Sequence, residues 1–570
     1  MQLIRAFRRS LPSGIEYSNR LDRELFLINK YGFQESFLQV REILDLVPDF
    51  RHITRGSAGC SLVAYLLGIH NLDPIENKFV LSRFMHENRP DFPDIDLDFA
   101  YNQRDVVLEK VKSKYSGRVA RISNHVLYKK RSAIRKALNV LGHKKFISRF
   151  INPFDIVGQE NVEHLATTAS QFEGKLKNYS LHCGGIVIFP DKVPNDLKLS
   201  NDQIKLNKDE VEKNKLFKID LLCNRGLAQI NDLSNRPLED YPEFDNQTAE
   251  VFKSGKTWGI TFGESPAQRR LYADIKPSNR SDISFCLALI RPLPSADGRR
   301  KEILDSIHQF KDYRGHIVYD DDGIMEIQKI LNCSESEAEL YRKSFSKNKK
   351  SGIEEFKKRI SNHPDKEQII KQLHYFSLYS FCKAHAYSYG NLVWALAYEK
   401  TRQPKKFWWS TLNHAQSMYR PWVHVQEAKL AGLQFRGFGK GPWKLDGDFL
   451  LPSHQEPTGD GWSQFDRRGY WISNRFMPGM YSETNGSSIK FRGLIATGRH
   501  HTVNDRDITF VTIGVGHGKY IDVILDGLYE FDMHDVLCGE GVLKNNSISC
   551  TNFKFEFVNQ KPKQLLLFSN

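Results

Sequence analysis

The chain has 570 residues, of which 40% are hydrophobic, so it is long enough for several domains and apolar enough to fold in water. Lys and Arg outnumber Asp and Glu by 14, and the pI near 9.1 predicts a surface that attracts polyanions, nucleic acid before anionic membrane. The sequence has no run of 18 apolar residues and no signal-peptide core, so we expect a cytoplasmic protein with no membrane contact. Its eight cysteines form no Cys-x-x-Cys pair, which argues against a zinc site or a disulfide scaffold.

The N-terminal part combines two predicted helices with a turn of small residues. Residues 16–48 carry apolar side chains mostly at helical spacing around a break at Tyr31-Gly32. The segment Ile53-Thr-Arg-Gly-Ser-Ala-Gly-Cys-Ser61 then runs into an apolar helical stretch that begins at Leu62. Small residues let a backbone approach a ligand, and the first turn of a helix offers N–H groups that suit phosphate. Arg55 adds a cation there, although a simple helix cap is the alternative.

An acidic stretch follows, with Asp94, Asp96 and Asp98 separated by apolar residues. In a strand these carboxylates share one face, and hard cations such as Mg²⁺ prefer such oxygen ligands. The alternative is an acidic edge strand that faces water. A phosphate-binding turn and a metal-binding carboxylate pair on neighbouring elements are the two parts that a nucleotidyl transferase needs.

Residues 118–150 are strongly basic, with Val, Leu and Ile between the cations, and predict helices that bury one side and offer the other to a phosphate backbone. A merely solvated basic face is the alternative. Residues 181–189 predict a glycine turn that leads into a buried strand. Residues 217–222 predict another short strand, on which Lys218 and Asp220 share a face.

The C-terminal part predicts a connector, a barrel and a tail. Residues 440–485 are rich in Gly, Pro, Ser and aromatic residues, which predicts irregular chain. Residues 488–558 contain five short alternating segments, which predict a small β-barrel. The tail Gln564-Leu-Leu-Leu-Phe568 predicts an exposed docking peptide, with a last strand of the barrel as the alternative.

Several of these segments together resemble one known family in content and in order. The motifs are Arg55-Gly-Ser-x-x-x-Ser-Leu-Val-Ala-Tyr65, Pro93-Asp-x-Asp-x-Asp-Phe99, His182-x-Gly-Gly-x-Val-Ile188, Lys218-x-Asp-x-Leu222, Leu289-Ile-Arg-Pro-Leu-Pro294, Arg342-Lys-Ser-Phe-Ser-Lys347 and Phe381-Cys-Lys-Ala-His-Ala-Tyr-Ser-Tyr389. They are similar to the palm and fingers of bacterial family C DNA polymerases, the alpha subunit of DNA polymerase III. Residues 16–440 are covered by the resemblance.

The resemblance implies a set of site residues. It implies that Asp94, Asp96 and Asp220 are the catalytic triad and hold two Mg²⁺ ions, with Mn²⁺ as a substitute, while Asp98 lies outside the triad. It implies nucleotide-binding roles for Arg55, Gly56, Ser57, Lys218, Arg291, Arg342, Lys343, Lys347, Lys383 and His385. The predicted DNA-binding cations are Lys129, Lys130, Arg131 and Arg135. The tail resembles the pentapeptide that docks on the sliding clamp, through Gln564, Leu565, Leu567 and Phe568.

The resemblance also implies a multidomain α+β architecture, with a polymerase beta-like nucleotidyltransferase palm, helical thumb and fingers, and a C-terminal OB-type β-barrel that binds single-stranded template. A purely structural barrel is the alternative. The expected boundaries are palm at 1–120 and 179–225, thumb at 121–178, fingers at 226–440, connector at 441–487, barrel at 488–560 and clamp-binding tail at 561–570.

Two fingers motifs keep the cations of the family pattern but differ from it in the small residues beside them. This difference puts the nucleotide selectivity in doubt more than the catalytic chemistry. The His- and Asp-rich PHP domain that opens the family is expected to be absent, and no proofreading module is recognised. We therefore expect a short, monomeric, template-directed DNA polymerase that uses primer-template DNA and dNTPs, of an auxiliary, repair, translesion or mobile-element type. The alternatives are a non-catalytic, clamp-tethered DNA-binding scaffold and a template-independent or ribonucleotide-adding transferase.

Overall fold

The computed structural model divides the chain into two compact units, which are described one at a time. Unit 1 comprises residues 1–50, 54–70 and 84–223, and unit 2 comprises residues 51–53, 71–83 and 224–570. The structure describes residues 2–88, 94–143, 157–158, 161–199, 202–295, 298–310, 316–377, 381–414, 416–435, 439–455, 488–503, 506–516, 519–531, 535–544 and 547–556.

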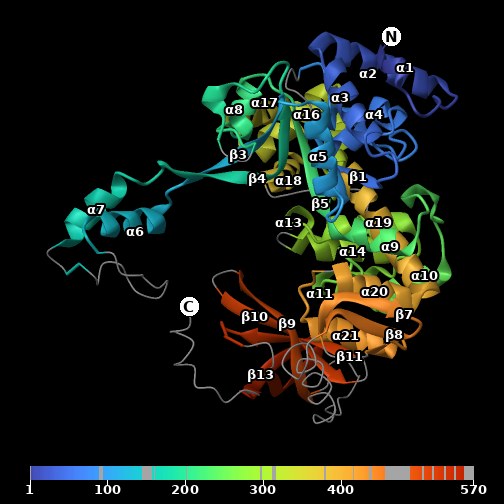
Figure 1. The fold of residues 1–570 in the computed structure, drawn as a ribbon, viewed down its shortest axis with the longest axis vertical. Coiled ribbons are helices and arrows are strands. Elements are labelled where there is room, and N and C mark those ends of the chain that lie inside the picture. The colour runs from blue at the N-terminus through green and yellow to red at the C-terminus, as the bar shows by residue number, and fades with distance from the viewer. Residues whose placement is uncertain are drawn as a thin grey trace. The chain divides into compact units, whose positions relative to one another are not determined.

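Unit 1 is built on a five-stranded sheet in the order β1-β2-β5-β4-β3 (Figure 1). Its strands are β1 (His52–Arg55), β2 (Ile95–Ala100), β3 (Val119–Leu127), β4 (Leu176–Ile188) and β5 (Lys218–Asn224). Its helices are α1 (Gln2–Arg5), α2 (Ile15–Tyr31), α3 (Gln34–Asp45), η1 (Gly56–Cys60), α4 (Leu62–Leu66), α5 (Arg104–Lys114), α6 (Lys130–Val140), α7 (Val162–Ser170), η5 (Asn195–Leu197) and α8 (Lys208–Lys213). The two predicted N-terminal helices are confirmed, and Gly32 ends α2 with a positive φ of 72°.

The glycine pair in β4 corrects the turn that the sequence predicted there. The strand runs through Gly184 and Gly185 and pairs with β5 antiparallel, with Gly185 opposite Asp220. A Cβ atom at Gly184 would lie 2.6 Å from the Leu222 side chain and 2.7 Å from the Leu221 carbonyl oxygen. The glycines therefore allow β5 to approach closely, which a side chain at Gly184 would prevent.

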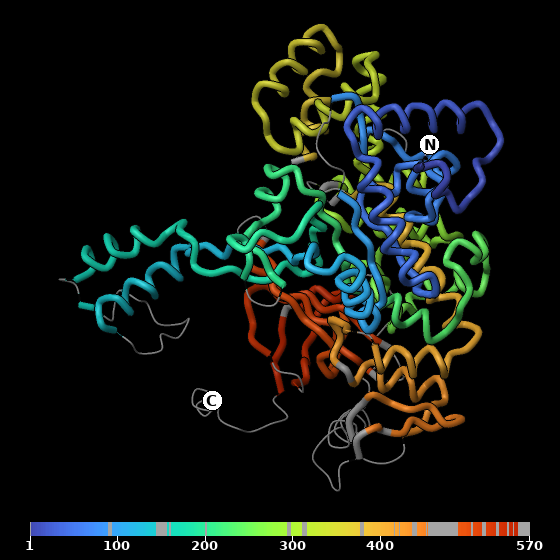
Figure 2. The backbone as a smooth tube through the Cα atoms, turned by 45° about the horizontal axis from the view of Figure 1, so that its top comes forward, coloured from blue at the N-terminus to red at the C-terminus, as the bar shows by residue number. Residues whose placement is uncertain are grey.

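The strands β3 and β4 extend from the sheet as a two-stranded arm that carries α6 and α7 (Figure 1 and Figure 2). The basic segment therefore begins as a strand, not as the predicted helix. Its apolar side chains on α6, among them Ala133 and Leu138, pack against Leu165 and Ala169 of α7. This packing turns the predicted DNA-binding cations of α6 outward, as the alternating sequence predicts for an amphipathic helix.

The first part of unit 2 is helical. Its elements are η2 (Leu81–Arg83), α9 (Arg225–Leu233), η6 (Leu238–Asp240), α10 (Asn246–Lys253), α11 (Pro266–Ile275), α12 (Arg280–Leu289), α13 (Pro292–Ser295), α14 (Arg299–Phe310), α15 (Asp320–Leu331), α16 (Glu335–Ser346), α17 (Lys350–Arg359), α18 (Lys366–His374), η8 (Tyr375–Ser377), α19 (Lys383–Arg402), α20 (Pro404–His414) and α21 (Pro421–Leu430). The long helix α19 is buried along most of its length, and Trp394 stacks on Phe252 with ring centroids 5.9 Å apart.

A three-stranded sheet follows the helices and corrects the expectation of irregular chain at residues 441–455, while residues 456–487 of the expected connector lie outside the described residues. It consists of β6 (Gln434–Phe435), β7 (Gly439–Asp446) and β8 (Phe449–Gln455), in the order β6-β8-β7. Trp443 is buried and accepts hydrogen bonds at its carbonyl oxygen from the side chains of Trp409 and Asn413. Side chains of α20 therefore hold these strands despite their glycine and proline.

The C-terminal strands form a closed barrel in the order β10-β11-β13-β12-β9, as predicted. They are β9 (Ser488–Val503), β10 (Arg506–Gly516), β11 (Lys519–Asp526), β12 (Val536–Lys544) and β13 (Ser547–Glu556). The pair β11–β13 is parallel, while β9 pairs antiparallel with β10 and β12. Alternate apolar residues fill the interior, among them Val511, Ile513 and Val523.

The helices of the described ranges include none that combines the length and the apolar character needed to cross a membrane.

Candidate active site

The three predicted catalytic residues lie on, or directly before, two adjacent strands of the sheet in unit 1. Asp96 lies within β2, Asp94 directly precedes that strand, and Asp220 lies on the neighbouring strand β5. Asp94 is about half exposed, while Asp220 is buried. The sheet therefore brings together carboxylates that are far apart in the sequence.

Two lysines neutralise part of this negative charge. Lys218 Nζ lies 2.6 Å from Asp220 Oδ2 and 3.7 Å from Asp94 Oδ1, and Lys208 Nζ lies 3.5 Å from Asp94 Oδ2. Burial acts against the ammonium form of Lys218, but the carboxylates of Asp220 and Asp94 outweigh it and raise its pKa. Lys218 was predicted as a site residue, whereas nothing in the sequence pattern singled out Lys208.

The pair Asp96 and Asp220, of which Asp96 is half-buried and Asp220 is buried, has the chemistry of a cation site. Burial and the neighbouring Asp220 raise the pKa of Asp96 to about 7. Within the described ranges, neither Asp96 Oδ1 nor Asp220 Oδ1 has a hydrogen-bond partner, although both atoms are buried. No set of three or more His, Cys, Asp or Glu side chains in that part of the chain is close enough to form a metal cluster. The two orphaned oxygens on adjacent strands nevertheless fit a hard divalent cation, which prefers carboxylate oxygen ligands.

The predicted nucleotide-binding turn lies beside this pair. Gly56 has a φ of 74°, and a Cβ atom there would lie 3.7 Å from Asp96 Oδ2, so the backbone of the turn is next to the carboxylate. Arg55 Nε and Nη2 both donate to Asp98 Oδ1, over 2.8 Å and 2.5 Å. Asp98 is fully buried. The third acidic residue of the triplet therefore orients Arg55, which is the supporting position that the sequence predicted for it.

The N-terminus of α4 corrects the expectation that its N–H groups bind phosphate. The fully buried carboxylate of Glu24 accepts from the backbone N–H groups of Leu62, at 2.8 Å, and Val63, at 3.0 Å. Ser61 Oγ also donates to Glu24, at 2.7 Å, and accepts from the Ala64 N–H group. Because a carboxylate already occupies this helix end, a phosphate would meet repulsion there.

Arg20 completes this support of the turn. Its Nε donates to Glu24 Oε1 over 2.8 Å and its Nη2 donates to the Cys60 carbonyl oxygen over 2.6 Å. The pair Arg20 and Glu24, one helical turn apart on α2, therefore fixes both sides of the junction between η1 and α4. Sequence reasoning missed both residues, because an (i, i+4) ion pair on an amphipathic helix ordinarily faces solvent.

His182 is a further residue close to Asp220. Its Nδ1 accepts from the backbone N–H groups of Gly184, at 3.3 Å, and Gly185, at 2.8 Å, and lies 3.7 Å from Asp220 Oδ1. Burial lowers the pKa of His182 more than Asp220 raises it. The motif His-x-Gly-Gly contained this residue, but no site role was predicted for it.

The predicted DNA-binding cations lie together on the arm. Lys129 precedes α6, and Lys130, Arg131 and Arg135 lie on it; all four are exposed. Their arrangement suits a charged surface, which the apolar contact with α7 holds in place.

Unit 2 brings three of the predicted fingers residues into one neighbourhood. The guanidinium of Arg291 lies 4.0 Å from the centre of the Phe381 ring, and the His385 ring lies 4.5 Å from the same ring. Lys383, at the start of α19, donates its backbone N–H to Asp321 and its Nζ to the carbonyl oxygen of Asn77.

Arg342 has a different setting, in a buried network of charges. Its Nε donates to Glu339 Oε2 over 2.6 Å, and its Nη1 lies 3.5 Å from Asp320 Oδ1. Arg83 also pairs with Asp320, at 2.6 Å, and with Glu339, at 3.3 Å. Burial acts against the charge of Arg83, but Asp320 and Glu339 raise its pKa well above the usual value. These pairs connect η2, α15 and α16.

Two further predicted fingers residues lie at the C-terminal end of α16 or directly after it. Lys343 lies on α16, and Lys347 is exposed directly after it. The clamp-binding residues Gln564, Leu565, Leu567 and Phe568 lie outside the described residues.

Comparisons with known proteins show which family models and which relatives the chain is similar to. Residues 3–223 match the model of the bacterial DNA polymerase III alpha NTPase domain, and residues 226–368 match the model of the bacterial DNA polymerase III alpha subunit finger domain. The chain is 26% identical to DNA polymerase III subunit alpha of Aquifex aeolicus, over 74% of this chain and 43% of that protein. It is 25% identical to the error-prone DNA polymerase of Dechloromonas aromatica, over 75% of this chain and 48% of that protein. The chain thus covers less than half the length of these relatives.

Proposed function

Since the chain belongs to the bacterial DNA polymerase III alpha family, we propose that it is a template-directed DNA polymerase that adds dNTPs to a primer 3′-hydroxyl. The observation that carries this proposal is the pair Asp96 and Asp220, whose buried, unpartnered oxygens lie beside Lys218 and the Arg55-Gly-Ser57 turn. Relatives named DNA polymerase III subunit alpha and relatives named error-prone DNA polymerase both match, so a repair or translesion role stays a prediction.

Asp94, Asp96 and Asp220 would hold two Mg²⁺ ions, or Mn²⁺ in their place. When bound, such ions lower the pKa of the attacking hydroxyl and stabilise the charge of the leaving pyrophosphate. Lys218 keeps the carboxylates close together without metal and would contribute positive charge beside the reacting phosphates.

The residues of the turn would position the incoming triphosphate. Arg55, oriented by Asp98, would present its guanidinium, and Gly56 and Ser57 would bring backbone close to the phosphates. From the fingers, Arg291, Lys343, Lys347, Lys383 and His385 would contact nucleotide or template. For Arg342 the buried pairs with Glu339 and Asp320 support a role in holding α15 and α16 together.

In domain terms, the sheet of unit 1 would be a polymerase beta-like palm, the arm with α6 and α7 the thumb, and the helices of unit 2 the fingers. Lys129, Lys130, Arg131 and Arg135 would contact the phosphates of the primer-template duplex. The barrel has the strand order expected of an OB-type fold, with its first strand paired to the second and the fourth.

Primer extension tests the function directly. We expect the wild-type chain to extend a DNA primer in Mg²⁺ only when a template strand is present, and to prefer dNTPs over rNTPs. Asp94→Asn should lose most of this activity but still bind the duplex, because its change removes a metal ligand and no phosphate contact. Extension without template would favour a template-independent transferase, and no extension in either Mg²⁺ or Mn²⁺ would favour the DNA-binding scaffold.

The C-terminal peptide Gln564-Leu-Leu-Leu-Phe568 is proposed to dock on a bacterial sliding clamp. The combined change Leu567→Ala and Phe568→Ala should remove clamp binding in a pull-down with purified clamp and leave clamp-free primer extension as it was, because it deletes the apolar anchors of the peptide. Binding that survives both changes would instead assign the segment to the barrel.

A further inference from the structure

Lys208 is a cation at the edge of the candidate site to which the proposed function assigns no role. It is the first residue of α8, and its Nζ lies 3.5 Å from Asp94 Oδ2. Its charge also acts on β4, because burial lowers the pKa of His182 and the charges of Lys218 and Lys208 lower it further. Lys208 is therefore close to side chains at the start of β2 and on β4, the two strands that flank β5.

The sequence around Lys208 fixes the point at which α8 begins. The Asn207 side chain accepts from the Glu210 N–H group at 2.9 Å, while the Glu210 side chain accepts from the Asn207 N–H group at 3.0 Å. The Asn207 side chain also lies 3.1 Å from His125 Nδ1 of β3, and Val211 packs into the core formed with β3 and β4. The backbone of Lys208 is therefore held in place, while its exposed side chain can change partner.

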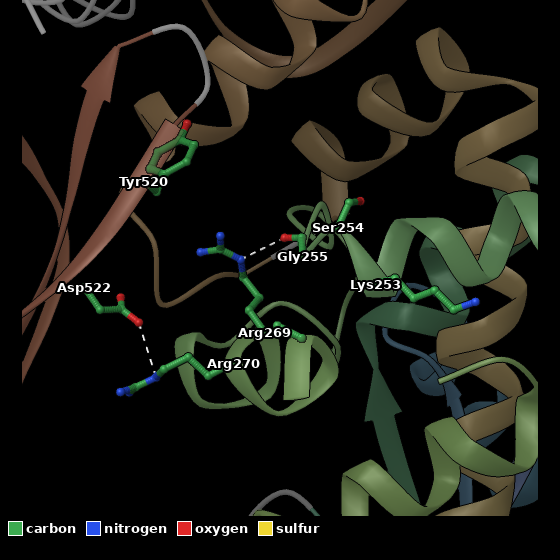
Figure 3. A pocket seen from close by; sticks show the side chains of 8 residues that line it. Lys253, Ser254, Gly255, Arg269, Arg270, Tyr520 and Asp522 are labelled. Atoms are coloured by element: carbon green, nitrogen blue, oxygen red, sulfur yellow. Dashed lines mark hydrogen bonds and ion pairs between the residues drawn. The ribbon is translucent and has the colours of Figure 1, made fainter. Parts of the chain in front are cut away.

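The partner of Lys208 distinguishes it from the cation of an ordinary ion pair. In the cavity of about 210 Å³ in unit 2, Arg270 Nε lies 3.4 Å from Asp522 Oδ2, and neither residue belongs to the candidate site (Figure 3). Asp94, by contrast, is proposed to hold Mg²⁺. Lys208 loses its pair once a divalent ion takes Asp94, because both cations compete for one carboxylate and repel each other. The pair with Asp94 therefore belongs to the metal-free protein.

Lys208 reaches the carboxylates from the edge of the sheet that lies away from the turn Arg55-Gly-Ser57. In the order β1-β2-β5-β4-β3, the turn follows β1 at one edge and lies next to Asp96, whereas α8 packs against β3 at the other edge. The strands β3 and β4 also carry the arm with the predicted DNA-binding cations. The DNA phosphate nearest to Asp94 is that of the primer end, because the metal site takes the primer 3′-hydroxyl. A phosphate that meets Lys208 therefore belongs to the primer strand and not to the triphosphate.

We propose that Lys208 exchanges its partner: it pairs with Asp94 in the metal-free protein, and it binds the last phosphodiester group of the primer strand when a divalent ion holds Asp94. The exchange rests on the proposed polymerase function, because that function assigns Asp94 to the metal. It has two consequences of opposite sign. Loss of the ammonium strengthens the binding of Mg²⁺ and weakens the binding of primer-template DNA.

The first test measures the Mg²⁺ affinity of Lys208→Gln in the absence of DNA. The Kd is obtained from the rise of the melting temperature with the MgCl₂ concentration. We expect this Kd to be about 2–5-fold lower than that of the wild type, because a competing surface cation has been removed. Lys213→Gln removes an exposed cation at the other end of α8 and should leave the Kd as it was. An unchanged or higher Kd in Lys208→Gln would overturn the exchange.

The second test measures the binding of a fluorescent primer-template duplex by anisotropy, in Mg²⁺ and in a chelator at the same ionic strength, without dNTPs. In Mg²⁺ the Kd of Lys208→Gln should exceed that of the wild type about 3–10-fold, because a charged phosphate contact is lost. In the chelator this difference should disappear, because Asp94 then holds the ammonium of the wild type. A loss of equal size in both conditions would make Lys208 a general surface charge and would overturn the proposal.

Two further comparisons separate the sources of the phosphate and the roles of charge and folding. A raised KM for dNTPs with unchanged duplex binding would place Lys208 at the triphosphate and overturn its assignment to the primer strand. Lys208→Arg keeps the charge and should keep both wild-type Kd values. A wild type that extends primers while Lys208→Gln matches Lys213→Gln in both assays would overturn this inference alone. A wild type that neither responds to Mg²⁺ nor extends primers would overturn the polymerase function and this inference with it.

Discussion

Replacing Asp96 by Asn is expected to abolish primer extension and at the same time to stabilise the metal-free protein. The activity should fall by roughly 10³-fold or more, because an amide cannot replace a charged ligand at the reacting phosphates. The stability should rise because the charge of the half-buried Asp96 lies beside that of Asp220, and its buried Oδ1 atom accepts no hydrogen bond. At pH 8 in a chelator, the free energy of unfolding should increase by roughly 2–4 kcal/mol.

The pH dependence gives this prediction a second measurement. The pKa of Asp96 is raised to about 7 in the folded protein, while an unfolded chain has a value near ~3.9. The folded state therefore binds more protons between these values, and the stability of the metal-free wild type should fall as the pH rises from about 4 to about 7. This fall should be smaller in Asp96→Asn, as thermal melts in a chelator would show.

Magnesium should reverse the order of stability of the wild type and Asp96→Asn. Mg²⁺ should raise the melting temperature of the wild type, because it binds the folded carboxylates, and should raise that of Asp96→Asn much less. A variant that is less stable than the wild type without metal, or one that gains equally from Mg²⁺, would contradict the cation site. Asp105→Asn, at an exposed carboxylate at the start of α5, is the matched control.

Removal of the Glu24 carboxylate should have the second large effect, on the free energy of unfolding and on the KM for dNTPs. Glu24→Ala should reduce the free energy of unfolding by about 3–5 kcal/mol, because Arg20 and the N–H groups of Leu62 and Val63 lose a buried partner. In the folded fraction, the KM for dNTPs should rise more than kcat falls, because the released junction lies directly after the turn that is proposed to bind the nucleotide. Urea melts and steady-state primer extension measure the two effects.

Variants of the same helix separate positioning from general loss of stability. Glu16→Gln changes an exposed carboxylate of α2 and should alter neither stability nor KM. Glu24→Asp keeps the charge and should recover part of the KM effect, whereas Glu24→Gln should not, because its amide places a donor against backbone donors. Equal KM values for Glu24→Ala and the wild type at a temperature where both are folded would show that Glu24 only stabilises α4.

Much of the site was predictable because its residues follow short local rules. Asp94 and Asp96 alternate along one strand, Lys218 and Asp220 along another, and the glycine at position 56 marks a turn. The barrel was predictable for the same reason, since its strands are consecutive and alternate clearly. The adjacency of β2 and β5 came from the family resemblance, because strand periodicity contains no information on which strands pair.

The interactions that sequence reasoning missed depend on distant partners or on burial. Glu24 supports a turn that lies 37 residues away, and its spacing from Arg20 is that of an ordinary surface ion pair. Arg342 was expected to contact nucleotide, and the sequence did not indicate its pairing with Asp320. Arg83, which lies in a remote segment of the chain, also pairs with Asp320. The strands β7 and β8 contain the glycine and proline that usually indicate irregular chain, and they depend on Trp409 and Asn413 to be held in place.

The central position of β5 has a consequence for how this protein is made on the ribosome. The strands β1 and β2 are synthesised first and β3 and β4 later, yet β5 lies between these two halves in the sheet. β2 ends at Ala100 and β5 begins at Lys218, so the hydrogen bonds that join the halves close a long loop and form late in folding. Asp220 and its counter-ion Lys218 enter on that same strand. A nascent chain therefore cannot join the two halves of the sheet, or supply Asp220 with its counter-ion, before β5 has been made, and no earlier intermediate carries the assembled candidate site.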